Sequence, residues 1–180
     1  MKYAIILLAL LLCSPSFAQA VNNAELEQMA QEDQNDRIND ADSLGARDEN
    51  RRWLLFRIIA EGGVNTPKDK FNAALILQHT GLEYKGEKLV STSVENYFLA
   101  YQYALSAYQS GLQSAKQLVA VTLDRYLWLA YGYQKYGTQT VFVNDKPYWV
   151  KIDTATPDEE RAEFGIAPLA ELLKKQEMLP

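Results

Sequence analysis

The chain has 180 residues, of which 48% are hydrophobic and 11% are aromatic, and its formal net charge is −5 at pH 7. This length and composition suffice for one hydrophobic core but hardly for two domains. The surplus of acidic residues argues against a nucleic-acid-binding surface, because such surfaces require clustered lysine and arginine.

The N-terminus has the pattern of a secretory signal peptide. Lys2 precedes an apolar run from residue 4 to residue 12, and Ala18-Gln19-Ala20 supplies the small residues of a cleavage site. The run is well short of the ~20 residues that span a bilayer, so we expect no stable membrane span in the mature chain. We predict a signal peptide at 1–20, a single helical domain at 21–180, and export to the periplasm or the medium.

A polar segment in the first predicted helix holds several candidate site residues. This helix begins near Asn22 and Glu25, which form a capping pattern, and it continues into a run that contains Glu32, Asp33 and Arg37. Asp33 and Arg37 are spaced as neighbours on a helix surface. From physics alone, the simpler interpretation is a solvated helix face with a weak salt bridge.

The second predicted helix carries a broad apolar face. We expect it to start at an N-cap, Asp48, and to stop at Gly62-Gly63. Because its apolar residues should face the core, we expect Arg51, Arg52 and Arg57 to line its wet side.

The third predicted helix ends near the only histidine of the chain. It begins at Thr66-Pro67, a cap followed by a first-turn proline, and His79 lies close to its end. A single histidine late in a helix is more often a cap or a satisfied polar partner than a catalyst. Residues 81–93 are mostly polar and contain turn-forming residues, so we expect a surface loop there.

The stretch from residue 96 to residue 139 predicts a helical hairpin followed by a glycine turn. Thr92 and Glu95 have capping-box spacing and Gly111 is a C′ stop, so the leading helix spans roughly 94–110. Its small residues would let a second helix approach closely, and its tyrosines fit a binding surface, although such a stripe is more often core. The small residues are Ala100, Ala104, Ala107 and Gly111, and the tyrosines are Tyr97, Tyr101, Tyr103 and Tyr108.

The second helix of the hairpin, 114–131, is apolar nearly all round, which is typical of a buried central helix. Asp124 and Arg125 are its only charges between Lys116 and Lys135. Because an isolated buried charge is costly, we expect both to be paired or to lie at a single wet patch. They are therefore leading candidates for a functional site.

Short β-like runs follow the hairpin. Two of them flank Asn144-Asp145, which predicts a small β hairpin near 141–152 with Pro147 at an edge. Thr156-Pro157 then opens a short helix, and a last helical turn or two follows Pro168. The predicted fold is mainly α: a compact helical domain of five or six helices with this small C-terminal β hairpin.

Part of the chain resembles one unit of a tetratricopeptide-type helical repeat. The resemblance rests on Ala73-Ala74, Gln78-His79, Tyr97, Ala100-Tyr101, Ala104, Ala107, Gly111, Ala115 and Leu118. About one and a half units are visible, whereas repeat arrays usually need three or more for stability. The resemblance is therefore to a tetratricopeptide-like helical hairpin and not to a solenoid.

From about Leu26 to Leu172 the chain is also similar to a family of bacterial proteins known as a domain of unknown function. The motifs that carry the resemblance are Met29-x-x-Glu32-Asp33-Gln34-x-x-Arg37, Asp48-x-Asn50, Gln78-His79, Asp124-Arg125 and Gln134-x-Tyr136-Gly137-Thr138-Gln139. The resemblance implies that these polar positions belong to one recurring set, and it implies no activity. The chain departs from the family pattern at 63–67, where a tighter glycine-proline turn is usual.

No cofactor is indicated by the sequence. It contains no P-loop, dinucleotide-binding glycine motif, G-x-S-x-G elbow or H-E-x-x-H helix, and one histidine cannot form a multi-histidine metal site. The only cysteine, Cys13, would leave with the signal, which excludes thiol catalysis and thiolate metal sites from the mature chain. We therefore expect neither a cofactor nor a metal.

The remaining candidates form a polar set on separate predicted elements: Glu32, Asp33, Arg37, His79, Asp124, Arg125 and Gln139. In one hypothesis His79 is the acid–base group of a hydrolase or transferase, and Asp33 or Asp124 orients it. Arg37 and Arg125 would then hold an anionic or acyl substrate at an ester, amide or phosphate. Glu32 and Gln139 are further candidates for binding.

In the competing hypothesis the same residues form a structural network, with Asp124–Arg37 and Asp33–Arg125 as pairs. The protein would then be a protein-binding or structural module of the cell envelope with an unidentified partner, and the sequence favours this role. The two hypotheses differ in solvent access. An active site must open to a cleft, whereas a structural network should be closed and fully hydrogen-bonded.

Overall fold

The computed structural model describes residues 20–39, 43–85, 88–143 and 146–177, so nearly all of the predicted signal peptide lies outside the described residues. Within these ranges the chain forms seven α-helices, one short 3₁₀ helix and two antiparallel β hairpins, and the fold is mainly α, as predicted. The elements are α1 (Ala24–Ile38), α2 (Leu44–Ala60), α3 (Pro67–Leu77), β1 (Leu82–Lys85), β2 (Lys88–Ser91), α4 (Glu95–Gln109), the 3₁₀ helix η1 (Gln113–Ala115), α5 (Lys116–Tyr131), β3 (Thr140–Val143), β4 (Lys146–Trp149), α6 (Asp158–Glu163) and α7 (Leu169–Glu177).

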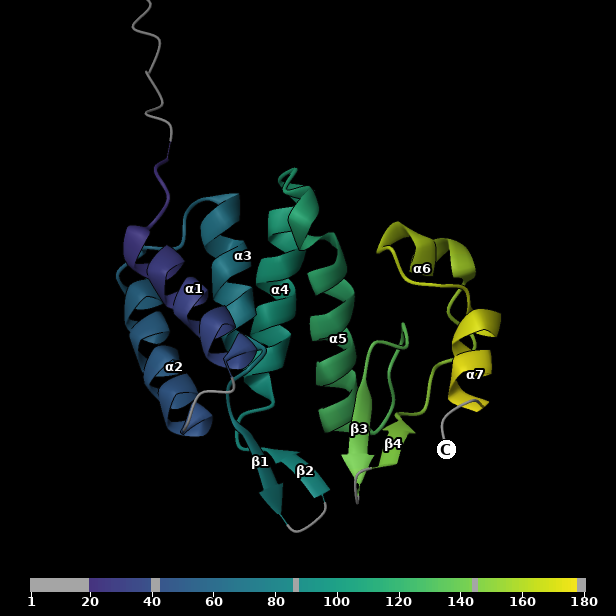
Figure 1. The fold of residues 1–180 in the computed structure, drawn as a ribbon. Coiled ribbons are helices and arrows are strands. Elements are labelled where there is room, and N and C mark those ends of the chain that lie inside the picture. The colour runs from purple at the N-terminus through teal and green to yellow at the C-terminus, as the bar shows by residue number, and fades with distance from the viewer. Residues whose placement is uncertain (1–19, 40–42, 86–87, 144–145, 178–180) are drawn as a thin grey trace, which may run out of the picture.

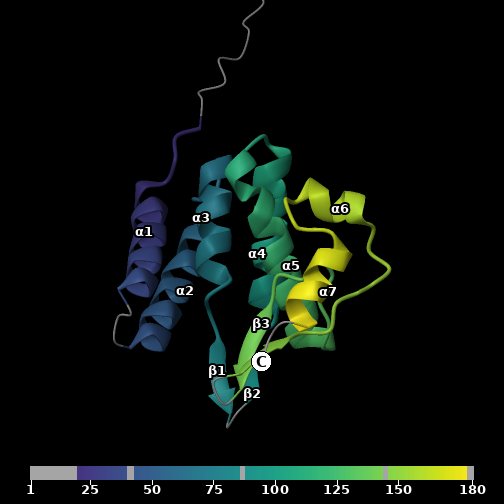
Figure 2. The same ribbon diagram turned by 45° about the vertical axis from the view of Figure 1, so that its right-hand side comes forward.

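Helices α1 to α5 lie side by side and run alternately in opposite directions (Figure 1). α1 and α2 form an antiparallel pair against α3, and α4 lies between α3 and α5. β3, β4, α6 and α7 follow on the other side of α5 (Figure 1), and α6 and α7 come forward in the turned view (Figure 2). This order brings the end of α1, the start of α2, the end of α3 and the β1–β2 hairpin to one end of the helical layer (Figure 1).

Small residues allow α3 and α4 to pack closely at the centre. Ala100, Ala104 and Ala107 of α4 are fully buried, as are Ala73 and Ala74 of α3. The three alanines of the predicted row are therefore confirmed as a packing surface, whereas Gly111, its fourth member, is exposed beyond the end of α4.

The tyrosines of α4 belong largely to the core and do not form an open binding surface. Tyr97 is fully buried, and its hydroxyl donates to the carbonyl oxygen of Thr80 at 2.7 Å. Tyr101, Tyr103 and Tyr108 are half-buried against the core.

α5 is not the buried central helix that its apolar sequence predicts. Residues 125–129 are half-buried and Tyr131 is exposed. α4 occupies the central place, and α5 has only small elements on its other side (Figure 1). The buried residues of α5 are Leu118, Val119, Ala120, Thr122 and Asp124.

Local sequence rules account for several helix ends. Thr66 and Asp69 form a reciprocal capping box at the start of α3. Gly111 follows α4 with a φ of 95°, a left-handed conformation that favours glycine. The side chain of Asn23, and not that of Asn22, caps α1.

One predicted helix start and one further predicted cap are wrong. α2 begins at Leu44, so Asp48 is not its N-cap but lies in its second turn. α4 begins at Glu95 without a side-chain cap, because the hydroxyl of Thr92 donates to the carbonyl oxygen of Gly81 instead.

Two β hairpins complete the fold. β1 and β2 pair with Leu82 opposite Ser91, which corrects the prediction of a loop over 81–93. The antiparallel pairing of β3 and β4 confirms the predicted C-terminal hairpin. The Asn144-Asp145 turn between them lies outside the described residues.

Candidate functional site

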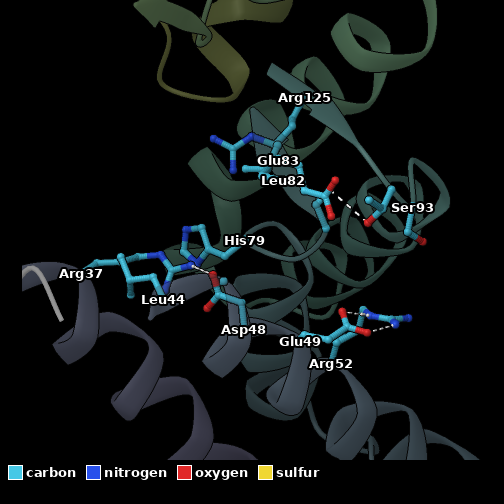
Figure 3. Close-up of a pocket in the computed structure, with 13 residues that line it drawn as sticks. Arg37, Leu44, Asp48, Glu49, Arg52, His79, Leu82, Glu83, Ser93 and Arg125 are labelled. Carbon is cyan, nitrogen blue, oxygen red and sulfur yellow. Dashed lines mark hydrogen bonds and ion pairs between the residues drawn. The ribbon is translucent and has the colours of Figure 1, made fainter. Parts of the chain in front are cut away.

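The predicted partners His79 and Asp33 meet where α1 and α3 end. His79 follows the C-cap residue of α3, and its Nδ1 atom is 2.8 Å from Oδ2 of Asp33 on α1. The Asp33 side chain is 1% exposed, whereas that of His79 is 18% exposed. Asp33 therefore holds the imidazole from the interior, and His79 also lines the cavity shown in Figure 3.

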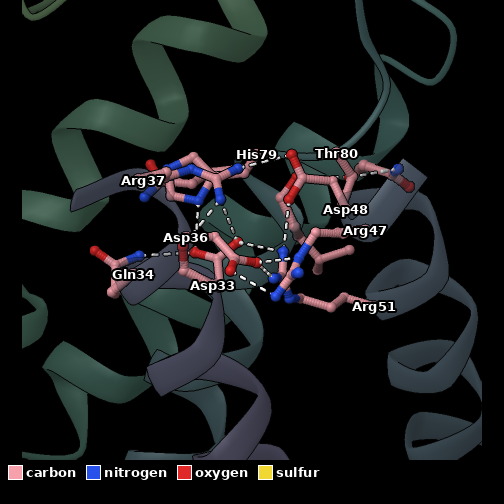
Figure 4. Close-up of polar contacts among 12 residues, drawn as sticks. Asp33, Gln34, Asp36, Arg37, Arg47, Asp48, Arg51, His79 and Thr80 are labelled. Atoms are coloured by element: carbon pink, nitrogen blue, oxygen red, sulfur yellow. Dashed lines mark hydrogen bonds and ion pairs between the residues drawn. The ribbon is translucent and has the colours of Figure 1, made fainter. Parts of the chain in front are cut away.

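The Asp33 carboxylate is saturated with donors (Figure 4). Oδ1 accepts from Nη1 of Arg37 at 2.9 Å, and Oδ2 accepts from Nε2 of Gln34 at 2.7 Å in addition to facing His79. Arg37 also reaches α2, where its Nη2 is 2.8 Å from Oδ2 of Asp48. The Asp33–Arg37 pair thus forms as the spacing predicts, but on a buried interface between α1 and α2 and not on a solvated face.

Arg51 extends the contacts along the same interface. It lies 2.9 Å from Asp48 and also pairs with Asp36, which in turn accepts from Arg47. Arg51 is buried, so the prediction that it lines the wet side of its helix is wrong. The helix packs this basic residue inward because carboxylates on α1 are there to receive it.

These six residues form what we call the ionic network: Asp33, Asp36, Asp48, Arg37, Arg47 and Arg51. Its formal charges cancel while His79 is neutral. Burial lowers the pKa of His79 below its ordinary value of 6.5, and the neighbouring Arg37 and Arg125 act in the same direction against the opposing effect of Asp33. His79 is therefore neutral at pH 7, with Nδ1–H donating to Asp33 and Nε2 carrying the free lone pair.

A cavity of about 790 Å³ opens beside His79 (Figure 3). Volumes of ~300–1,000 Å³ are typical of small-molecule sites. Three of the predicted site residues line it, namely Arg37, His79 and Arg125. The wall also contains the charged residues Asp48, Glu49, Arg52 and Glu83 and the hydroxyl residues Thr92 and Ser93.

Arg125 reaches this cavity from α5. Its Nη1 donates to the carbonyl oxygen of Gln78 at 2.6 Å, and its Nε donates to Oε1 of Gln139 at 3.2 Å. Among the described residues no carboxylate forms an ion pair with it, so the predicted Asp33–Arg125 pair does not form. Burial lowers the pKa of Arg125 below its ordinary value, and the group stays charged at pH 7. A cation without a counter-ion at a cavity wall suits an anionic ligand.

Asp124 lies outside the cavity wall and is not a partner of His79. Its carboxylate accepts from the backbone N–H groups of Lys135, Tyr136 and Thr138 at 2.7, 2.8 and 2.9 Å. It also accepts from the Thr138 hydroxyl at 2.8 Å. These bonds fix the turn that follows α5, and the predicted Asp124–Arg37 pair does not form.

The two remaining predicted residues do not line the cavity. Gln139 is buried behind it, where its side-chain oxygen holds Arg125. Glu32 is exposed on α1, and it accepts a hydrogen bond from Gln28 at 2.9 Å. Gln139 therefore positions a cavity residue, whereas Glu32 has no contact with the site.

Asp48 was not selected from the sequence as a candidate site residue because it was assigned to a helix cap, although the family resemblance included Asp48-x-Asn50 in its polar set. Burial raises the pKa of Asp48, and its hydrogen bond from Arg37 opposes this shift. The i, i+3 spacing of Asp48 and Arg51 was the available signal, because such residues share one face of a helix. Glu49 and Arg52 repeat the same spacing one residue later.

No protein family, curated protein or solved structure matches the chain. In the described ranges, no three His, Cys, Asp or Glu side chains are grouped so that they could hold a metal ion. No helix in the same part of the chain is long and apolar enough to cross a membrane. The arguments below therefore rest on the geometry of the His79 cavity.

Proposed function

We propose that the protein binds a small anionic substrate in the His79 cavity and hydrolyses it, or transfers a group from it, with His79 as the base. The observation that carries the proposal is a pair of free polar atoms on residues of one cavity wall. Among the described residues, neither Nε2 of His79 nor Nη2 of Arg125 has a hydrogen-bond partner, although Asp33 and Gln78 hold the neighbouring nitrogens. A base and an anion-binding donor are thus available to the same ligand.

The chemistry follows from a neutral His79. Nε2 accepts a proton from water or from a hydroxyl nucleophile, and the nucleophile's oxygen bonds to the carbonyl carbon or phosphorus of the substrate. The substrate oxygen that gains negative charge accepts hydrogen bonds from Arg125. The proton then moves from Nε2 to the leaving group as the bond to that group breaks. Asp33 keeps Nδ1 protonated and stabilises the transient imidazolium.

The contrast between the ionic network and the cavity supports a site over a purely structural role. Every carboxylate of the network is paired, because Asp33, Asp36 and Asp48 all lie within bonding distance of arginines. A structural role accounts for these residues and for Asp124. It leaves unexplained why His79 and Arg125 line a cavity with unused polar atoms.

A substrate screen with matched variants tests the proposal. The mature chain is assayed against nitrophenyl esters and anilides that carry a carboxylate, and against aryl phosphates. We expect His79→Gln to lower kcat/KM by about 100-fold or more, because a general base contributes that much. Glu32→Gln, on the exposed side of α1, serves as the control and should retain full activity. Lack of turnover across the whole panel, or full turnover by His79→Gln, would refute the proposal.

A protein-binding role in the cell envelope is the second candidate, and an exposed aromatic cluster favours it. Phe98 is 45% exposed and Tyr131 is 65% exposed. The ring centroid of Tyr126 lies 5.2 Å from that of Phe98 and 5.9 Å from that of Tyr131. Aromatic side chains are enriched in interaction hot spots. We expect a Phe98→Ala, Tyr126→Ala double variant to lose a partner, captured from an envelope extract, that His79→Gln still binds. Equal capture by both variants would argue against this role.

A further inference from the structure

The carboxylates that line the His79 cavity differ in their cationic partners. Asp48 is paired with two arginines of the ionic network. Glu49 is bonded to Arg52 through both of its oxygens. Glu83, on β1, is exposed and forms no ion pair with any described residue. Glu83 is thus the uncompensated anion of the described cavity wall.

The guanidinium groups of the same wall show the complementary pattern. Arg37 is paired with aspartates, and Arg52 with Glu49. Arg125 has carbonyl and amide oxygens as its partners and no carboxylate in the described part of the chain. One cation and one anion therefore line the same cavity, unpaired with each other and with their described neighbours.

We propose that the cavity selects a dipolar ligand, with an anionic group on Arg125 and an ammonium group on Glu83. Free amino acids and short peptides with both ends uncapped have this charge pattern. The inference rests on the proposed function, because it specifies the substrate class of the same site. A cavity of about 790 Å³ has room for a ligand of this size.

Electrostatics gives the direction and the size of the preference. A ligand that is only anionic gains the attraction of Arg125 but brings a second negative charge into a cavity that already contains Glu83. An ammonium group replaces that repulsion with an attraction. Because Glu83 is exposed, solvent screens the interaction, and we expect a preference of about fivefold rather than a hundredfold.

Calorimetric titration of the mature chain with three probes tests this inference. The probes are alanyl-alanine, its N-acetyl derivative and its C-terminal amide. We expect alanyl-alanine to bind about fivefold more tightly than the N-acetyl derivative, and the amide to bind most weakly because it lacks the anionic group. In Glu83→Gln the ratio of the first two affinities should fall to near one. The control variant Glu32→Gln should keep the wild-type ratio.

Arg125→Gln separates this inference from the proposed function, and far-UV circular dichroism verifies its fold. The dipolar inference would be overturned if the wild type bound the free and acetylated dipeptides with equal affinity. If Arg125→Gln then lost both affinities, the anion site would still stand. A ratio that Glu83→Gln does not change would overturn the dipolar inference as well. Failure of all three probes to bind would also overturn it. The proposed function would then be tested separately, by the substrate screen described above.

Discussion

His79 joins a charge-balanced network to an open cavity, and this position determines its chemistry. Its partner Asp33 also accepts from Arg37 and Gln34, so the carboxylate is a weaker attractor for a proton on His79 than an isolated one would be. The effect of burial on the pKa of His79 is therefore larger than that of Asp33, and the pKa is lowered. The imidazole is consequently a base at pH 7 and not a charged partner in a salt bridge.

The first prediction concerns stability against pH. Because the pKa of folded His79 lies below its ordinary value of 6.5, protonation favours the unfolded chain. The stabilisation from neutral His79 is fully present above pH 6.5 and is lost as the pH falls from there toward the folded pKa. Urea unfolding of wild type and His79→Gln between pH 5 and pH 8 measures it. The stability difference, wild type minus variant, should decrease toward acid pH. A difference that grows toward acid pH would mean that the folded pKa is raised.

The second prediction separates Asp124 from the site. Asp124→Ala removes the acceptor of three backbone N–H groups and one hydroxyl, leaving buried donors unsatisfied. We expect a loss of about 3 kcal/mol in the free energy of unfolding. Denaturant unfolding measures this loss, with the exposed Glu32→Ala as the control, which should change stability by less than about 0.5 kcal/mol. A stable Asp124→Ala variant without activity would instead place Asp124 in the chemistry.

At the residue scale, the sequence identified several polar residues that meet in the fold, but it did not identify most of their partners. Asp33, Arg37, His79 and Arg125 do gather around one cavity. Asp124 does not, although it adjoins Arg125 in the sequence. Successive residues of a helix point about 100° apart, and here Asp124 faces the turn after α5 whereas Arg125 faces the cavity. Which of them does so depends on tertiary packing and cannot be read from spacing.

At the scale of elements, the ionic network is the main polar contact between α1 and α2. Carboxylates of α1 pair with arginines of α2. In one further pair the charges are exchanged, because Arg37 of α1 binds Asp48 of α2. The pair of helices also carries the wall of the cavity, because Arg37 and Asp48 line it. Stability of this interface and geometry of the site are therefore coupled.

The third prediction compares two arginines of the network that differ in burial. Arg51 is 6% exposed and pairs with Asp36 and Asp48, whereas Arg47 is 50% exposed and pairs with Asp36 alone. We expect Arg51→Ala to cost about 3 kcal/mol, because it leaves buried carboxylates short of a partner. Arg47→Ala should cost less than about 1 kcal/mol. Urea unfolding at pH 7 measures both losses, and equal costs would show that solvent reaches the whole network.

The elements that the sequence did not predict correctly share a lack of local signal. α2 begins after Ser43, which has a left-handed backbone and makes no side-chain cap bond, so no capping rule identifies it. β1 (LEYK) and β2 (KLVS) contain charged residues and few β-branched ones, whereas the equally short β3 (TVFV) is rich in them. By contrast, α3 begins with the cap Thr66 and the first-turn proline Pro67, from which it was predicted.

At the scale of the whole molecule, the C-terminal segment supports the cavity from behind. Gln134 is fully buried and bonds to the backbone of both Gln139 and Val150. Gln139 in turn holds the guanidinium of Arg125. A site at one end of the helical layer thus depends on residues far along the chain. The sequence could place these residues in a turn but could not show what they support, because the contacts are long-range.

The fourth prediction concerns the residue that organises this C-terminal segment. Arg161 on α6 is fully buried, and its guanidinium donates to the carbonyl oxygens of Thr156, Asp153 and Lys135. These bonds tie α6 to the turn that follows α5. Arg161→Ala would leave three buried carbonyls without this donor, and we expect it to cost about 3 kcal/mol.

Hydrogen exchange followed by mass spectrometry locates the effect of Arg161→Ala. Because the lost bonds lie in the C-terminal segment, exchange should accelerate in residues 146–177 while the buried amides of α3 and α4 keep their protection. Arg57→Ala, at an exposed arginine on α2, serves as the control and should leave both regions unchanged. Uniform acceleration across all helices would instead mean that the segment and the helical layer unfold as one cooperative unit. In that case loss of Arg161 would also weaken anion binding at Arg125, through Gln139, in proportion to the loss of stability.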